Sequence, residues 1–327
     1  MISVAMCTYN GEAFIEEQLN SIIGQTKQPD EIVICDDCSQ DNTIQKAEEV
    51  LRTWSGNVKI IKNTHNLGYR LNFQKAISLC TGDVIFLSDQ DDVWDLKKIE
   101  IIYQSFLNYP EIKLVFHDAA LVDQRLQLLH PSFWHLLSFN PDDFSRNGYK
   151  RLLLGNVVQG SACAFRRELF RTASPFPKEA VHDEWLALVA AISGGILPIS
   201  QPLMKYRQGN NQIGGEVRTF HQGIHIWRTQ ARESVKKHVQ QIENRKTVLS
   251  LLSQRYSSLI ALDFYDELNK IEFFWNMRIQ YILGEKMFIN WEHYSKYCVD
   301  YRQAIRQSLK DIFAKLYCRK NKIINLL

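Results

Sequence analysis

Residues 84–92 read VIFLSDQDD, an apolar run that ends in a polar segment with three aspartates. A short run of this kind predicts a strand that is buried on both faces, as in a parallel sheet. Ligands bind at the carboxyl ends of the strands in such sheets, and the aspartates fall at that end. The stretch therefore predicts both a sheet and the position of its binding edge.

The same alternation extends to both sides of this stretch through the first 115 residues. The expected strands are residues 2–7, 31–35, 58–61, 83–87 and 114–116. The expected helices are residues 12–23, 41–51, 71–79 and 95–107. Short apolar strands separated by helices of about 10 to 15 residues predict an α/β fold, with a mostly parallel sheet and helices on both faces.

Polar clusters follow four of the expected strands. They are residues 8–10, 36–37, 66–70 and 88–92. Because the carboxyl ends of parallel strands meet at one edge, we expect these four loops to converge on one crevice.

The later part of the chain is less regular and then becomes helical. Prolines predict turns at Pro131, Pro141, Pro175 and Pro177, and residues 160–165 predict a further strand. From about residue 216, apolar residues recur at helical spacing, from Val235 to Leu259 and again from Ile305 to Leu316. We therefore predict a binding and catalytic domain over residues 1–215 and a basic amphipathic helical region over residues 216–327.

Charge is distributed unevenly between these two regions. The formal charge is −5 for residues 1–215 and +8 for residues 216–327, which sum to +3. A basic half suits nucleic acid, acidic lipid headgroups or a lipid-diphosphate acceptor, but no nucleic-acid-binding motif accompanies it, so we expect no nucleic acid partner. The basic segments 218–255 and 302–322 predict contact with a membrane surface; packing on the core and a homodimer interface are alternatives.

Several features predict a cytoplasmic protein, with the inner face of the cell membrane as a peripheral location. The first ten residues read as a strand rather than a secretory signal. The longest nearly uncharged stretch, residues 185–199, is shorter than the roughly 20 apolar residues of a membrane span. Seven cysteines without regular spacing favour a reducing compartment.

Asp89 and Asp91 stand two residues apart at the end of an expected strand, so their carboxylates project toward the same side. Such a pair can hold Mg²⁺ or Mn²⁺ that also binds two phosphate oxygens. The alternative is a turn of capping aspartates before the next helix.

Asp36 and Asp37 close the second expected strand. A carboxylate here can accept the N3–H of uracil or thymine, or the ribose hydroxyls, because it carries several lone pairs. An Asx turn is the alternative, and it describes Asp41 better than the Asp-Asp pair. We favour ligand binding for Asp37.

These motifs, with residues 7–11 (CTYNG) and 66–68 (NLG), resemble family 2 inverting glycosyltransferases over roughly the first 215 residues. The resemblance implies a Rossmann-like GT-A fold, a dTDP-sugar or UDP-sugar donor and a divalent metal. It implies Asp91, with Asp89, as the metal ligands. The donor-binding residues that it implies are Thr8, Tyr9, Glu12, Asp37, Asn66, Arg70, Asp89 and Gln90.

Residues 182–185 (HDEW) begin an expected helix. The resemblance implies Asp183 as the general base, which an acceptor hydroxyl needs because it is a poor nucleophile until its proton is drawn away. A helix N-cap is the alternative. Many relatives carry Glu before this aspartate, whereas this chain has His182.

Arg207 precedes a loop rich in Gly and Asn, and a guanidinium there suits the grip of a leaving diphosphate. A solvated surface arginine is the alternative. The acceptor-binding residues that we expect are Gly160, Ser161, Glu184 and Trp185. The combination of SDQDDVW, HDEW and YRQ resembles bacterial rhamnosyltransferases of polysaccharide assembly, which suggests dTDP-L-rhamnose as the donor.

The favoured function is therefore transfer of a sugar from a nucleotide-diphosphate donor to a hydroxyl of an acceptor glycan, which suits a lipid-linked acceptor. Two alternatives come from other classes. A nucleotidyltransferase on a similar sheet would release pyrophosphate, and a non-catalytic scaffold subunit would bind a nucleotide sugar without transferring it.

Overall fold

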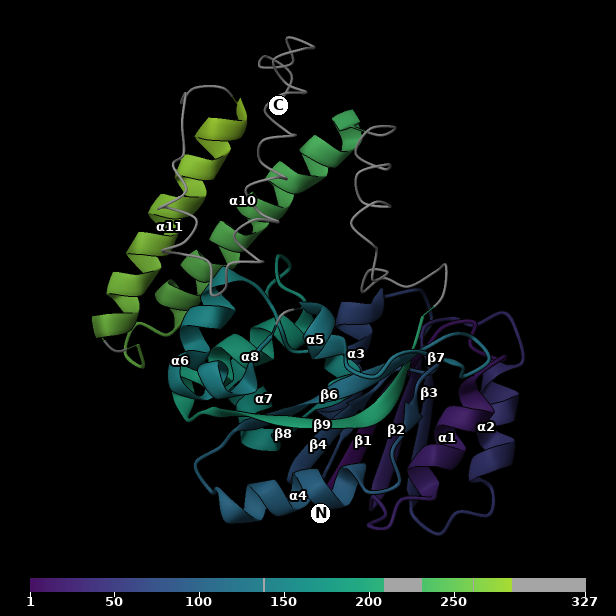
Figure 1. Ribbon diagram of the computed structural model, residues 1–327. Coiled ribbons are helices and arrows are strands. Elements are labelled where there is room, and N and C mark those ends of the chain that lie inside the picture. The colour runs from purple at the N-terminus through teal and green to yellow at the C-terminus, as the bar shows by residue number, and fades with distance from the viewer. Residues whose placement is uncertain (138, 209–230, 261, 284–327) are drawn as a thin grey trace. The chain divides into compact units, whose positions relative to one another are not determined.

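The computed structural model describes residues 1–137, 139–208, 231–260 and 262–283 (Figure 1). The chain divides into two compact units. As far as the chain is described, one contains residues 1–148 and 156–208, and the other contains residues 149–155 and the helices after residue 230. The predicted boundary at residue 215 does not anticipate that residues 149–155 belong with the second unit.

The first unit is built on a sheet whose described part has nine strands. They are β1 (Ile2–Thr8), β2 (Glu31–Asp36), β3 (Asn57–Lys62), β4 (Val84–Ser88), β5 (Val93–Trp94), β6 (Leu114–Val122), β7 (Leu128–His130), β8 (Cys163–Arg166) and β9 (Ile196–Arg207). The order is β3-β2-β1-β4-β8-β6-β9-β5, with β7 beside β6. The first four strands in this order are parallel, as predicted, whereas β8 is antiparallel to both its neighbours. The sheet is therefore mixed rather than mostly parallel.

Helices cover both faces of this sheet (Figure 1). They are α1 (Ile15–Ile23), α2 (Thr43–Leu51), α3 (Tyr69–Leu79), α4 (Lys98–Asn108), α5 (Phe133–Leu137), α6 (Pro141–Leu154), α7 (Arg167–Ala173) and α8 (His182–Ser193), with a 3₁₀ turn, η1, at Gly160–Ala162. Side chains alternate between the faces of a strand. In β1, Ile2, Val4 and Met6 join the core formed with α1, α2 and α4. The opposite face lies against α3, which also contacts α8.

The predicted elements of the first 115 residues are present, with small differences at their ends. Helix α1 begins at Ile15 rather than residue 12, and α4 begins at Lys98 rather than residue 95. Strand β6 runs on to Val122. Pro141 begins α6 instead of marking only a turn, because the first helical position needs no backbone N–H.

The second unit contains α10 (Ala231–Arg255) and α11 (Leu262–Leu283) beside the end of α6. Apolar residues of both helices are buried, as the helical spacing predicts. Leu259, expected on the same stripe, is 49% exposed because α10 ends at Arg255. Among the described residues, no helix is both long and apolar enough to cross a membrane. The expected helix around residues 305–316 lies outside the described residues.

Candidate functional site

The loops after β1 and β4 are joined by a pair of hydrogen bonds at the carboxyl edge of the sheet. The backbone N–H of Tyr9 donates to Gln90 Oε1 (2.8 Å), and Gln90 Nε2 donates to the Tyr9 carbonyl (3.0 Å). The Gln90 amide therefore holds the two loops together, and its contact with the sugar donor stays a prediction. Gly11 leaves room for it, since a Cβ at Gly11 would lie 2.2 Å from Gln90 Oε1.

The aspartates after β2 organise the next loops. Thr8, a predicted contact of the sugar donor, is 2% exposed, and its Oγ1 donates a hydrogen bond to Asp36 Oδ1 (2.8 Å) within the chain. Asp37 accepts hydrogen bonds from the N–H groups of Leu67 (2.7 Å) and Gly68 (2.8 Å), and it is 4% exposed. Asp37 therefore holds the loop before α3, and its Oδ2 keeps a lone pair that could accept a further hydrogen bond.

Three more of the expected donor contacts lie around these loops. Glu12 Oε2 accepts the Asn42 N–H (2.9 Å) just before α2, so Glu12 holds a helix start instead of facing a ligand. Arg70 Nη1 donates to the Pro177 carbonyl (2.7 Å). Asn66 is exposed, and its Oδ1 accepts the N–H of Gly68 (3.0 Å).

Asp89 and Asp91 lie together after β4, as their spacing predicts. Burial raises the pKa of Asp89, and the charges of Asp91 and Asp183 raise it further. Burial also raises the pKa of Asp91, against the lowering effect of Arg207. Two half-buried carboxylates that disfavour each other's charge are hard oxygen ligands suited to Mg²⁺ or Mn²⁺, with phosphate oxygens as further ligands. The described residues contain no group of three or more acidic, His or Cys side chains able to hold a metal by themselves.

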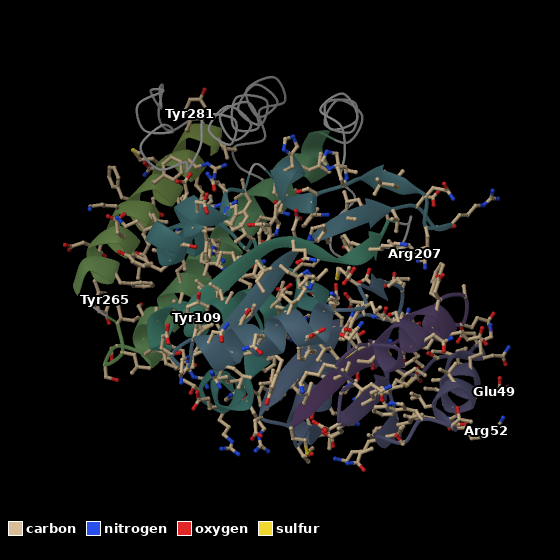
Figure 2. All side chains as sticks on the ribbon, turned by 60° about the horizontal axis from the view of Figure 1, so that its bottom comes forward. Glu49, Arg52, Tyr109, Arg207, Tyr265 and Tyr281 are labelled. Atoms are coloured by element: carbon tan, nitrogen blue, oxygen red, sulfur yellow. The ribbon has the colours of Figure 1, made fainter. Side chains whose placement is uncertain are left out.

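Arg207, at the end of β9, contacts this acidic loop (Figure 2). Its Nε donates to the Asp91 carbonyl (2.7 Å), and its Nη2 donates to Glu17 Oε2 (2.6 Å). The guanidinium also lies over the Phe14 ring, 4.6 Å from its centroid. Arg207 is 3% exposed and positions the loop, and its contact with the diphosphate stays a prediction.

Lys98 is a buried cation that the sequence reading does not single out. Its Nζ donates to the Ser161 carbonyl (2.6 Å) and lies 3.8 Å from the centroid of Trp94. Burial lowers the pKa of Lys98 to about 7, while the Asp92 charge opposes that effect. A lysine in a charged segment is usually solvated, so its nearness to the aspartates is the only signal in the sequence.

Asp183 stands at the start of α8 and faces η1. Its Oδ2 accepts the Gly160 N–H (3.0 Å), and its Oδ1 accepts Asn156 Nδ2 (3.1 Å). Burial raises the pKa of Asp183 to about 7, and these two donors lower it. A carboxylate with this pKa suits a general base near neutral pH.

The residues of the predicted acceptor wall differ in exposure. Gly160 donates to Asp183, and Glu184 is half-buried. Ser161 and Trp185 are both fully buried, and Trp185 Nε1 donates to the Ala173 carbonyl (2.8 Å). Trp185 packs in the core, and the contacts of these four residues with an acceptor stay predictions.

Asp37, Asp89 and Asp183, each from a separate motif, lie at one edge of the sheet. The Asp37 N–H donates to the Thr8 carbonyl (2.8 Å), the Tyr9 N–H donates to Gln90, and the turn η1, which donates to Asp183, packs against β4. The charge of Asp183 in turn acts on Asp89. The edge therefore carries the acidic pair, the candidate base and the loops that surround them.

The family model described as glycosyl transferase family 2 matches residues 3–173 of this chain. The chain belongs to this family. The glycosyltransferase is 29% identical over 225 residues to the dTDP-rhamnosyl transferase RfbG of Shigella flexneri, which covers 65% of this chain and 74% of RfbG. It is 26% identical over 172 residues to an uncharacterized glycosyltransferase of Haemophilus influenzae, with 52% of this chain and 54% of that protein covered.

Solved structures confirm the GT-A fold of the glycosyltransferase. The crystal structure of S. aureus TarS 1–349 with UDP-GlcNAc has a TM-score of 0.54 at 16% identity, and covers 84% of this chain and 91% of that chain. The mannosyltransferase PcManGT of Pyrobaculum calidifontis, with GDP-Man and Mn²⁺, has a TM-score of 0.52 at 16% identity. The match covers 96% of this chain and 86% of PcManGT. At this identity the likeness establishes the fold alone.

Proposed function

We propose that this glycosyltransferase moves a sugar from a nucleotide-diphosphate donor to a hydroxyl of an acceptor glycan, with inversion at the anomeric carbon. One observation carries the proposal: the turn η1, whose Gly160 N–H donates to Asp183 (3.0 Å), packs against β4, the strand that ends in the acidic pair. The charge of Asp183 accordingly acts on Asp89. A direct displacement needs both groups at the same reaction centre.

Asp183 takes the proton of the attacking hydroxyl in this reaction. The acceptor oxygen forms a bond to the anomeric carbon while the bond from that carbon to the nucleoside diphosphate breaks, and the electron pair leaves with the diphosphate. The N–H groups of Gly160 and Asn156 hold the Asp183 carboxylate in place for the proton transfer.

Asp89 and Asp91 would hold a divalent cation, Mg²⁺ or Mn²⁺. The cation, when bound, would neutralise charge on the departing diphosphate. Arg207 positions these carboxylates through the Asp91 carbonyl. The solved structure of PcManGT contains Mn²⁺, which supports this part of the proposal.

The donor that we propose is dTDP-L-rhamnose. The relative RfbG is named a dTDP-rhamnosyl transferase, which supports this choice over a UDP sugar. Of the predicted donor contacts, Tyr9 and Asn66 are exposed at the edge, and Asp89 is half-buried there. The nucleoside contact of Asp37 stays a prediction.

The test is the Asp183→Asn variant with dTDP-L-rhamnose and Mg²⁺. We expect kcat to fall about 10²–10⁴-fold, because a positioned base contributes this much, while donor affinity stays within about twofold. The exposed Glu179→Gln variant is the control and should keep the parental rate. Transfer by Asp183→Asn at that rate would remove the base assignment, and NMR of the product tests inversion.

The acceptor, the membrane surface and the homodimer stay predictions. The basic segment 302–322 lies outside the described residues, and the segment 218–255 is described only from residue 231. Flotation of the full chain with anionic and with neutral vesicles tests the membrane prediction, since electrostatic binding requires the anionic lipid.

A further inference from the structure

The side chain of His182 is buried without a hydrogen bond. It begins α8 and is 5% exposed. Its ring stacks on Phe73 of α3, with ring centroids 4.3 Å apart, and meets the edge of Tyr69 at 6.1 Å. Neither ring nitrogen has a hydrogen-bond partner within the described part of the chain.

This arrangement is costly for a residue with only a packing role. Burial lowers the pKa of His182 to about 3, so the ring is neutral and carries one donor and one acceptor. Each buried polar atom without a partner costs about 1–3 kcal/mol, whereas an aromatic ring without nitrogens would fill the space at no such cost. The unpaired nitrogens therefore indicate a partner from outside the chain.

One ring nitrogen of His182 adjoins the candidate base. A Cβ at Gly160 would lie 2.8 Å from His182 Nε2 and 3.6 Å from Asp183 Oδ2. The Gly160 backbone is thus next to both groups, and a ligand oxygen would reach Nε2 from this side when η1 moves aside.

Tyr69 adds an exposed aromatic surface to the same place. Its ring is 39% exposed at the first position of α3. Burial raises the pKa of Tyr69, and the Asp183 charge adds to this effect, so the phenol lies within electrostatic reach of Asp183. A ring in this position can pack on the C–H face of a sugar while its neighbours bind hydroxyls.

We propose that Tyr69 and His182 form a subsite for the acceptor sugar beside Asp183. In it a nitrogen of His182 hydrogen-bonds one sugar hydroxyl, and the exposed Tyr69 ring packs against the sugar. The inference rests on the proposed function, because Asp183 marks the position of the attacking hydroxyl. A hydroxyl both donates and accepts, so it matches a neutral imidazole in either tautomer.

The test measures binding and stability together. The full chain with dTDP and Mg²⁺ is titrated with a panel of methyl glycosides, including methyl α-L-rhamnoside, by ligand-observed NMR. We expect His182→Phe to raise the glycoside Kd about 2–10-fold, the loss of one hydrogen bond. The same variant should raise the unfolding midpoint by about 2–4 °C, because it removes unpaired buried atoms.

Two tyrosines provide the matched comparison. Tyr69→Ala should raise the glycoside Kd about 2–10-fold, and Tyr69→Phe should leave it nearly unchanged, since the ring is kept. Tyr109, which follows α4, is 48% exposed and lies well apart from Arg207 in Figure 2. Tyr109→Ala should bind the glycoside like the parent.

Three results would overturn the subsite. They are no glycoside binding by the parent, an unchanged glycoside Kd in both His182→Phe and Tyr69→Ala, and variants that bind the nucleotide sugar more weakly but the glycoside as the parent does. The last result would place the donor sugar there. The titration needs no turnover. If the chain binds glycosides in a His182-dependent way but transfers no sugar, the proposed function is refuted and the subsite is not.

Discussion

The two ends of the binding edge satisfy their polar groups in different ways. At the end formed by β1 and β2, the side chains of Glu12, Asp36 and Asp37 accept hydrogen bonds from the chain itself. At the end formed by η1 and α8, Asp183 also accepts hydrogen bonds from the chain but has a raised pKa, and neither ring nitrogen of His182 has a partner among the residues that the structure describes. The first end is completed by folding, so we infer that a ligand completes the second.

The largest effect that we expect tests the buried support of the acidic loop after β4. Arg207→Met removes donors from the Asp91 and Gln124 carbonyls in a buried place, and should cost about 2–4 kcal/mol of the free energy of unfolding. Urea unfolding measures it. The exposed Lys205→Met, two residues earlier in β9, should change stability by less than about 0.5 kcal/mol. Equal losses in the two variants would contradict the role of Arg207.

A smaller effect tests whether the first end is complete without a ligand. Asp37→Asn places an amide N–H₂ against one of the N–H groups of Leu67 and Gly68, so it should cost about 1–3 kcal/mol of stability. Asp123→Asn is a matched control, because Asp123 accepts the N–H groups of Arg125 and Gln127 in a turn after β6. Unchanged stability with weaker donor binding would instead assign Asp37 a direct nucleoside contact.

The smallest effect concerns the pH dependence of the second end. A general base acts in its deprotonated form, and the pKa of Asp183 is raised to about 7. The rate should therefore rise with pH through about 7 and level off above about 8, and at pH 6 kcat should be about tenfold below its plateau. The profile is measured at saturating donor and metal. If donor affinity falls in parallel, Asp89 limits the rate and the assignment to Asp183 loses its support.

Local pattern predicts the first half of the fold well. Strands β1, β2 and β4 are apolar on both faces, so their position follows from composition alone. The start of α4 differs because Asp95 accepts the Lys97 N–H in a short turn before the helix. The antiparallel β8 depends on pairing with β4 and β6, which no local pattern reveals.

The placement of the site is predictable, but the partners of its residues are not. Asp89, Asp91 and Asp183 reach one edge because each follows or precedes a recognisable element. The contacts of Arg207 with Glu17 and of Lys98 with Ser161 join residues far apart in sequence, so a motif cannot show whether such a cation is buried. The role inferred for His182 likewise depends on its ring contacts with Phe73 and Tyr69, which are far from it in sequence.

The bridge between Gln90 and the Tyr9 backbone constrains how related sequences can vary. A methyl group at Gly11 would overlap the Gln90 amide, so alanine there would displace this flexible side chain and break its bonds to Tyr9. The two positions should covary across the family. The residue type at the middle position of the motif would then depend on the loop that contains Gly11 and not on the sugar that is transferred.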